Sequence, residues 1–334
     1  MIARSQGKIE PVSWQVSLRE AWTDPLALLC HLGVNPAAAG FDPAAAEGFA
    51  FRVPRPYAAL IAPGDPTDPL LRQVLPVAAE RARIEGFVAD PVGDRAAERE
   101  PGLLQKYSGR ALLLVTGACA IHCRYCFRRE FPYHDSVGTR RLEVACAAIA
   151  ADPDIDEVIL SGGDPLLLAD DRLAALAGQL AAIPHLRRLR IHTRLPVTLP
   201  DRLTADFLRW FAGSHLEPVL VLHLNHPRET SPALMEALMP LRRAGVTLLN
   251  QAVLLRGVND DTETLVALSR KLHAAGILPY YLHVLDRVQG AAHFEVDDQR
   301  ASALAAELRA RLPGYLVPRL VREVPGAPSK TPLL

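Results

Sequence analysis

Three cysteines, Cys119, Cys123 and Cys126, lie within eight positions of one another, directly after an apolar run. Thiolates at this spacing on one compact loop can hold three irons of a four-iron cluster. The two other cysteines, Cys30 and Cys146, lie far away in segments with helical patterns, where buried small apolar side chains are expected. The fourth iron would then lack a protein ligand. An open iron is a site for chemistry rather than for electron transfer alone.

Two other chemistries use the same residue types. A zinc site could combine the three thiolates with His122 or His134, and the thiols could instead form a redox-active group. The spacing of the cysteines and their position after a predicted strand favour the cluster. An odd total of five cysteines makes a poor disulfide framework and indicates a reducing compartment.

Lysine is scarce, because only Lys8, Lys106, Lys271 and Lys330 stand against 33 arginines. A primary amine held beside a pocket can form a Schiff base with pyridoxal phosphate (PLP). Lys330 lies in a proline-rich segment that resists fraying, although a lysine so near a chain end is usually a mobile, solvated charge. Lys8 and Lys271 are expected to be surface charges. Lys106, just before a predicted strand, suits contact with a phosphate.

Apolar strands alternate with amphipathic helices from residue 111 onward, and this pattern predicts the elements that position these residues. Six such units in sequence predict a parallel sheet, and their steady spacing favours an α/β fold with a partial (β/α)6 barrel of the TIM type. The predicted strands are 111–117, 157–163, 187–194, 218–226, 246–255 and 279–286. The predicted helices are 140–151, 171–182, 204–211, 232–244, 262–275 and 297–311.

Around this barrel we expect three segments. Residues 1–100 form a mostly helical N-terminal extension, with helices over 14–32 and around 70–80. Residues 101–315 form the barrel. Residues 316–334 form a last strand, over 316–324, and the tail that carries the late lysine.

Composition excludes several classes of protein. Of the 334 residues, 49% are hydrophobic and 22% are charged, which excludes a disordered chain. Lys plus Arg and Asp plus Glu are both 37, so no global positive field attracts nucleic acid or an anionic membrane. Apolar runs such as 111–115 are too short to span a bilayer, and no apolar signal core opens the chain. A cytoplasmic protein is expected.

In such a barrel, residues that follow the carboxyl ends of the strands form the active face. Polar side chains collect at these positions, although glycines there also suit a tight strand-to-helix turn. Besides the cysteine loop, they are Ser161, Gly162, Gly163, Asp164, His192, Arg194, His223 to His226, Gln251 and Asp286.

These features resemble the radical S-adenosylmethionine (SAM) superfamily, whose mark is CxxxCxxC after the first strand of a partial (β/α)6 barrel. The resemblance implies that the open iron of a [4Fe-4S] cluster binds SAM, and that reduction cleaves SAM to a 5′-deoxyadenosyl radical. It also implies that the SAM amino group is bound by the segment Ser161, Gly162, Gly163 and Asp164.

Further motifs resemble the lysine 2,3-aminomutase family from about Phe51 to the end of the chain. They are CFRRE after the third cysteine, SGGD, LNHP, QAVLLRGVND, LPYYLH and a late PGxxxK. The resemblance implies an isomerase that uses PLP. By family position, Lys330 binds PLP, its phosphate contacts Lys106, Tyr107 and Arg194, and SAM lies near His223 and Gln251.

The implied substrate is L-lysine, whose carboxylate and distal ammonium need partners of opposite charge. By family position, Arg128 pairs with the carboxylate, while Asp286 and Glu323 bind the ε-ammonium. Glu323 stands where these mutases usually have aspartate. The alternative is a solvated arginine and two surface acids.

Within the family, the chain resembles the short EpmB-type members, which make (R)-β-lysine for elongation factor P and its lysyl ligase. Asp261 follows the GVND run where the fermentative mutases have a zinc-binding cysteine. A homo-oligomer is left open. One alternative is a mutase for glutamate or arginine, although glutamate would need a cation where Asp286 and Glu323 stand. Another is an Fe–S scaffold without catalytic activity.

Overall fold

One ten-stranded sheet organises the molecule, and its strands lie side by side in chain order. The computed structural model describes residues 13–333, so the predicted surface charge Lys8 lies outside the described residues. Six parallel strands form the centre of the sheet, each within a few residues of its predicted range. They are β3 (Arg110–Thr116), β4 (Glu157–Gly162), β5 (Arg188–Thr193), β6 (Glu217–Leu222), β7 (Thr247–Val253) and β8 (Leu278–His283).

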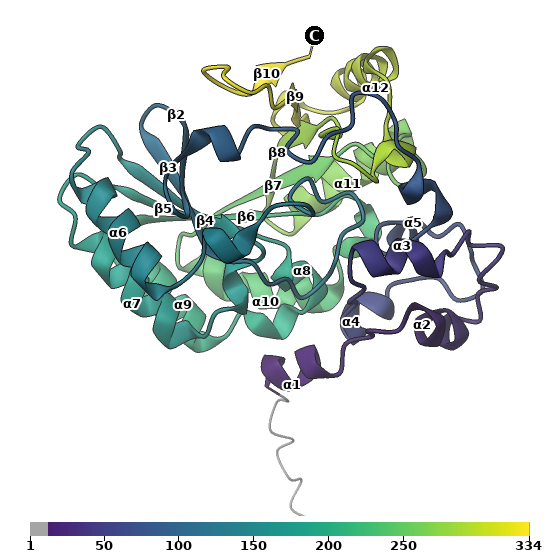
Figure 1. The fold of residues 1–334 in the computed structure, drawn as a ribbon, viewed down its shortest axis with the longest axis horizontal. Helices are drawn as coiled ribbons and strands as arrows, with labels where there is room; N and C mark the ends of the chain where they lie inside the picture. The colour runs from purple at the N-terminus through teal and green to yellow at the C-terminus, as the bar shows by residue number, and fades with distance from the viewer. Residues whose placement is uncertain (1–12, 334) are drawn as a thin grey trace, which may run out of the picture.

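Helices connect these strands and cover the outer side of the sheet (Figure 1). The six predicted helices are confirmed, with every end within one residue of its prediction. They are α6 (Thr139–Ala150), α7 (Asp170–Ala181), α9 (Ala205–Ala212), α10 (Pro232–Arg243), α11 (Thr262–Ala274) and α12 (Asp298–Arg311). Asp261 is the N-cap of α11, because its Oδ1 accepts a hydrogen bond from the Thr264 amide at 2.9 Å. The short helix α8 (Leu195–Thr198) follows β5 directly.

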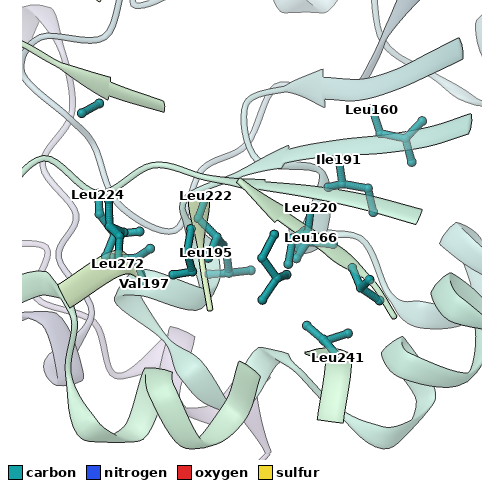
Figure 2. Packing of buried hydrophobic residues seen from close by; sticks show 14 of the residues in the cluster. Leu160, Leu166, Ile191, Leu195, Val197, Leu220, Leu222, Leu224, Leu241 and Leu272 are labelled. Carbon is teal, nitrogen blue, oxygen red and sulfur yellow. The ribbon is translucent and has the colours of Figure 1, made fainter. Parts of the chain in front are cut away.

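Leucine-rich packing holds the helices on the sheet, as Figure 2 shows. Strand β4 is buried along its whole length, as expected for a parallel strand between two covered faces. Each fully buried leucine stabilises the fold by roughly 1.5–3 kcal/mol. Strand, loop and helix residues meet in this layer, among them Leu160, Leu166, Ile191, Leu195, Val197, Leu220, Leu222, Leu224, Leu241 and Leu272.

Short strands extend the sheet at both edges, and the sequence analysis predicted only one of them, the strand within 316–324. At one edge, β1 (Glu98–Glu100) and β2 (Leu103–Tyr107) run antiparallel to their neighbours and lead into β3. At the other edge, β9 (Arg319–Arg322) is parallel to β8, and β10 (Thr331–Pro332) folds back antiparallel on β9. The strand order puts β1 and β10 at opposite edges, so the described sheet is an open, partial barrel, as predicted. The sheet crosses both predicted segment boundaries, and the division into three segments stays a prediction.

Two helix predictions for the N-terminal extension are wrong. The range 14–32 contains two helices, α1 (Trp14–Arg19) and α2 (Pro25–Leu32). Pro25 explains the break, because proline has no amide proton and suits the first turn of a new helix, here capped by Asp24.

The range 70–80 likewise contains only the short α5 (Pro69–Arg72) and a 3-10 turn over Ala78–Arg81. Pro76 lies between them and prevents a continuous helix. The helices α3 (Pro43–Gly48) and α4 (Arg55–Ala58) complete the extension. Helices α2 to α5 gather beside one end of the sheet (Figure 1).

The extension has its own apolar core, and the cysteine loop packs against it. Leu28, Leu70 and Val74 are among its fully buried members, and Ile121 of the cysteine loop joins them. Cys123 also packs on this core. The extension therefore supports the loop from one side, while the barrel supports it from the other.

The cysteines outside the loop differ from each other. Cys146 on α6 packs partly buried against the main core. Cys30 on α2 is exposed, so its predicted burial is wrong: it faces away from the apolar side that α2 presents. Among the described residues, no helix combines the length and the apolarity that crossing a bilayer requires.

Candidate active site

A cavity of about 270 Å³ opens at the carboxyl ends of the parallel strands. Every predicted site residue contributes to its wall, which brings together segments from both edges of the sheet. These residues are Cys119, Cys123, Cys126, Lys106, Tyr107, Arg128, Ser161, Gly162, Gly163, Asp164, Arg194, His223, Gln251, Asp286, Glu323 and Lys330.

The two glycines after β4 allow the backbone to approach the cysteine loop closely. The Gly163 amide donates to the Thr116 carbonyl at 2.7 Å, and Gly162 has a φ of 125°. A Cβ at Gly163 would lie 2.2 Å from the Ala118 carbonyl oxygen. The predicted tight turn is therefore present, and it fixes the start of the cysteine loop.

The side chain of Asp164, the next residue, is fully used in hydrogen bonds that hold this turn. Its Oδ1 accepts from the Leu166 amide at 3.1 Å and from the Thr193 hydroxyl at 2.7 Å. Its Oδ2 accepts from the amides of Arg194 and Leu195, both at 2.8 Å. With four protein donors, this carboxylate holds the ends of β4 and β5 together, and it has little capacity left for a ligand.

The three thiols are half-buried, in a setting that suits a cationic group. Burial and the neighbouring Cys123 raise the pKa of Cys126 to about 11. Burial also raises the pKa of Cys119. A metal centre would supply the positive charge that makes such thiols ionise and bind as thiolates.

The histidines that a zinc site would need point elsewhere. His122 uses its Nδ1 on the Ala50 carbonyl at 2.9 Å and stacks near Phe49. His134 has 80% of its side chain exposed and pairs with Asp135. Within residues 13–333, no three side chains of His, Cys, Asp or Glu are arranged to hold a single ion. Three sulfurs without a fourth protein donor fit a cluster with an open iron.

Arg194 lies at the cysteine end of the cavity. Its Nη1 donates to the Cys123 Sγ at 2.6 Å, and its Nη2 donates to Gln73 at 2.7 Å and to Glu229 at 2.6 Å. The expectation that Arg194 joins Lys106 and Tyr107 at a phosphate finds no support in these contacts. In this structure the guanidinium is held by partners around the cysteine loop, and its contact with a phosphate stays a prediction.

In the middle of the cavity, Asp94 joins two predicted site residues. It accepts from the Arg128 Nε at 2.6 Å and pairs with the Lys106 Nζ at 2.6 Å. Burial raises the pKa of Asp94, but the two cations outweigh burial and hold this pKa below its ordinary value. The Arg128 Nη1 also donates to the Ser161 hydroxyl at 3.0 Å. The sequence analysis missed Asp94, because no local motif marks this single acid in the extension.

Lys330 and Glu323 form an ion pair in the wall of the same cavity. The β9–β10 pairing explains it, because Glu323 directly follows β9 and Lys330 directly precedes β10. The Lys106 Nζ lies 3.2 Å from the second oxygen of Glu323. Burial raises the pKa of Glu323, but both lysines lower it more, to about 2. With 19% of its side chain exposed, Lys330 is not a mobile charge at the chain end.

Asp286 follows β8 and faces this ion pair. Burial and the nearby charge of Glu323 raise its pKa to about 7, against the opposing effect of Lys330. Two carboxyls so placed, with one ionised and one poised near neutral pH, form a site for a cation.

Three histidines with buried Nε2 atoms line the cavity. The Nε2 atoms of His192, His223 and His283 have no hydrogen-bond partner. Burial, with Arg194 and Arg128, lowers the pKa of His223 to about 4, so its imidazole is neutral. Such atoms are available to hydrogen-bond a ligand. The sequence analysis missed His283, although the polar-apolar alternation at the end of β8 points it into the barrel.

Comparisons with known proteins agree with this geometry. The Radical SAM superfamily pattern matches residues 113–268. L-lysine 2,3-aminomutase of Escherichia coli (strain K12) is 50% identical and covers 96% of this chain and 94% of its own. The protein of the same name from Haemophilus influenzae is 46% identical and covers 96% of each chain. That from Clostridium subterminale is 38% identical and covers 83% of this chain and 67% of its own.

Among solved structures, anSMEcpe with bound AdoMet covers 59% of this chain and 57% of its own, with 11% identity and a TM-score of 0.46. The cysteine loop and the glycine turn both lie within the matched superfamily region. The Escherichia coli and Haemophilus influenzae relatives are aligned over 322 and 323 residues, which extends well beyond that region. By this identity and coverage, the chain belongs to the lysine 2,3-aminomutase family of the radical SAM superfamily.

Proposed function

We propose that this protein is an L-lysine 2,3-aminomutase, an isomerase that moves the α-amino group of L-lysine to carbon 3. The observation that carries the proposal is that one cavity is lined by two kinds of group. Three thiols line it, and so does a lysine amine that pairs with Glu323 and lies near Asp286. A reaction that uses both a cluster and PLP on one substrate needs both groups in the same cavity.

Membership in the superfamily brings a [4Fe-4S] cluster and SAM to the cysteine end. Cys119, Cys123 and Cys126 would hold three irons and leave the fourth open. When bound, the cluster and SAM supply the radical that takes up and returns a hydrogen atom. The neutral His223 and Gln251 line the space next to the loop and would hydrogen-bond SAM without adding charge.

PLP belongs beside Lys330, which would hold it, and Lys106 with Tyr107 would face its phosphate. When bound, PLP supplies an aldehyde carbon for the migrating nitrogen. The ammonium of Lys330 must give up a proton before it can act as a nucleophile, and Glu323 holds that ammonium in the free protein.

The charges of the cavity match those of free lysine. Glu323 already binds one ε-ammonium, that of Lys330, which supports the same carboxylate as the partner of the substrate's ammonium. Asp286 provides a second carboxyl within the same cavity. Arg128, held in place by Asp94, would pair with the substrate carboxylate. A mutase for glutamate would place a carboxylate against two acids.

A direct test uses anaerobic protein with reconstituted cluster, PLP, SAM, dithionite and L-lysine. We expect β-lysine by chiral chromatography, with the R form predicted, and 5′-deoxyadenosine released only when lysine is present. Borohydride should fix PLP on Lys330 in the wild type and in the exposed-lysine control Lys271→Ala, but not in Lys330→Ala. Product from glutamate alone, or label at Lys106, would contradict the assignment.

The proposal extends to the role of the product. We infer that (R)-β-lysine made in the cytoplasm is passed to the ligase that modifies elongation factor P, as the resemblance to the short family members implies. Elongation factor P incubated with this protein, its ligase and L-lysine should gain the mass of one lysyl residue. Its retention time after digestion should match a β-lysyl standard, and an α-lysyl product would contradict the link.

A further inference from the structure

The side chain of Arg194 touches a sulfur of the proposed cluster site. This residue directly follows β5, and its amide is fixed by the Asp164 Oδ2 at 2.8 Å. Its Nη1 donates to the Cys123 Sγ at 2.6 Å. Only 5% of Arg194 is exposed, so solvent screens its charge little.

The other side of the same guanidinium is held by a buried carboxylate. The Arg194 Nη2 donates to the Glu229 Oε1 at 2.6 Å, and Glu229 is completely buried. The second oxygen of Glu229 accepts from the amides of Asn225 at 2.6 Å and His226 at 2.8 Å. The carboxylate is therefore fixed by backbone groups, and it fixes Arg194 against Cys123.

One donor of Arg194 is left over. Its Nε is buried and has no hydrogen-bond partner. The proposed catalytic chemistry, which uses the three cysteines, SAM, PLP and lysine, gives no role to Glu229 or to the contact between Arg194 and Cys123. One donor of this buried guanidinium contacts a sulfur of the proposed cluster site, and another is unpaired. A fixed carboxylate holds the group in place, which indicates a role at the cluster.

A hydrogen bond to a ligating sulfur, and a positive charge beside it, stabilise the more negative, reduced state of an iron–sulfur cluster. Both effects raise its reduction potential. A carboxylate behind the guanidinium partly cancels the positive charge, so it lowers the potential again. The two residues therefore act on the cluster with opposite signs.

We propose that Arg194 and Glu229 set the reduction potential of the cluster through Cys123, with Arg194 raising it and Glu229 limiting the rise. The inference rests on the proposed function, which places the cluster on this loop. The redox step is the uptake of one electron by the cluster from a low-potential one-electron donor, without transfer of a proton. Both are positioning residues in this proposal.

Potentiometric titration of the anaerobically reconstituted protein, followed by the electron paramagnetic resonance signal of the reduced cluster, tests the pair. In Arg194→Gln, the ratio of reduced to oxidised cluster at the wild-type midpoint should fall about tenfold, a shift of about 59 mV for one electron. In Glu229→Gln, which can still accept one backbone hydrogen bond, that ratio should rise.

Arg188→Gln is the matched control. Arg188 is the first residue of β5, the strand that Arg194 follows, and it pairs with Asp156 outside the cavity, so its removal should leave the midpoint unchanged. If Arg194→Gln fails to hold a cluster, Arg194→Lys replaces it, with a smaller shift in the same direction.

Opposite shifts in the two variants support the proposal, because general damage to the loop would move both midpoints the same way. An unchanged midpoint in the Arg194 variant, or equal signs in both, overturns it. Wild-type protein that binds no iron would instead refute the proposed function. The two failures are therefore distinguishable.

Discussion

At the residue scale, the two acids near Lys330 have very different pKa values because their neighbours differ. Glu323 contacts two lysines, and its pKa falls to about 2 although burial opposes this. Asp286, buried beside Glu323, keeps a proton until about pH 7. Glu323 is therefore ionised throughout the neutral range, while Asp286 changes charge within it.

This difference predicts how L-lysine binding depends on pH. The ammonium of the substrate needs the ionised form of Asp286, and with a pKa of about 7 its ionised fraction rises roughly tenfold from pH 6 to pH 8. We therefore expect the affinity of PLP-loaded, unreduced protein for L-lysine to rise by up to about tenfold over that range, measured by calorimetry.

Asp286→Asn is the control, because an amide does not titrate. Its binding should be weaker and nearly independent of pH between 6 and 8. An affinity that falls with rising pH in the wild type, or an Asn variant with the same profile, would contradict the role of Asp286.

Adding one methyl group at Gly163 tests whether the close backbone approach at the glycine turn is needed for iron binding. In Gly163→Ala the added carbon would meet the Ala118 carbonyl at 2.2 Å, so the cysteine loop must move. We expect this variant to fold but to bind much less iron after reconstitution. Gly178→Ala on α7 has nothing within 4 Å of the new carbon and should bind iron normally, while gaining about 0.5–1 kcal/mol of helix stability.

At the element scale, the N-terminal extension holds the cysteine loop through Arg124, the residue after Cys123. Its guanidinium is fully buried and makes a two-point contact with Glu80, from Nε to Oε1 at 2.8 Å and from Nη2 to Oε2 at 2.6 Å. It also donates to the carbonyls of Phe49 at 2.7 Å and Ala45 at 2.9 Å. The end of α3 and the 3-10 turn of the extension thus meet at one residue of the loop.

Glu80→Gln should remove the charge that balances this buried guanidinium. Breaking a buried pair by removing one partner costs roughly 3–5 kcal/mol. We expect a loss of this size in the free energy of unfolding in urea, together with a lower iron content. Arg81, the residue after Glu80, forms an exposed ion pair with Asp42. Arg81→Ala removes this pair and should lower the free energy of unfolding by less than about 1 kcal/mol. Equal losses of unfolding free energy in the two variants would show that the buried Arg124–Glu80 pair stabilises the fold no more than an exposed pair does.

At the scale of the whole molecule, the extension and the barrel share buried polar contacts besides their apolar cores. Gln73 and Glu80 bind arginines that flank or touch the cysteine loop, and Asp94 binds Arg128 inside the cavity. Separating the two parts would leave buried charges without partners. Because leaving these charges unpaired costs free energy, we expect the extension and the barrel to unfold together.

Urea unfolding of the metal-free protein should therefore be a single transition. Variants that keep only Trp22, in the extension, or only Trp210, on α9, should give the same midpoint by fluorescence and by circular dichroism. An earlier transition at Trp22 would show that the extension unfolds by itself, and would contradict this coupling.

Local patterns in the sequence determined the parallel strands, the six outer helices, the CxxxCxxC loop and the glycine turn after β4. The reason is that periodicity, helix caps and loop spacing act over a few residues, and neighbouring strands pair in chain order. The same locality explains the errors at Pro25 and Pro76, where a proline outweighed an amphipathic pattern. Family resemblance, not spacing, supplied the roles expected of the substrate-binding residues.

Only the tertiary structure decided the partners of the buried charges. Glu80, Asp94 and Glu229 carry no local signal, yet each neutralises an arginine that lies 34 to 44 positions away in the chain. The β9–β10 pairing that puts Lys330 on Glu323 likewise depends on a two-residue strand too short to show a pattern. Long-range packing chooses these pairs, because a buried charge is stable only where the completed fold supplies its opposite.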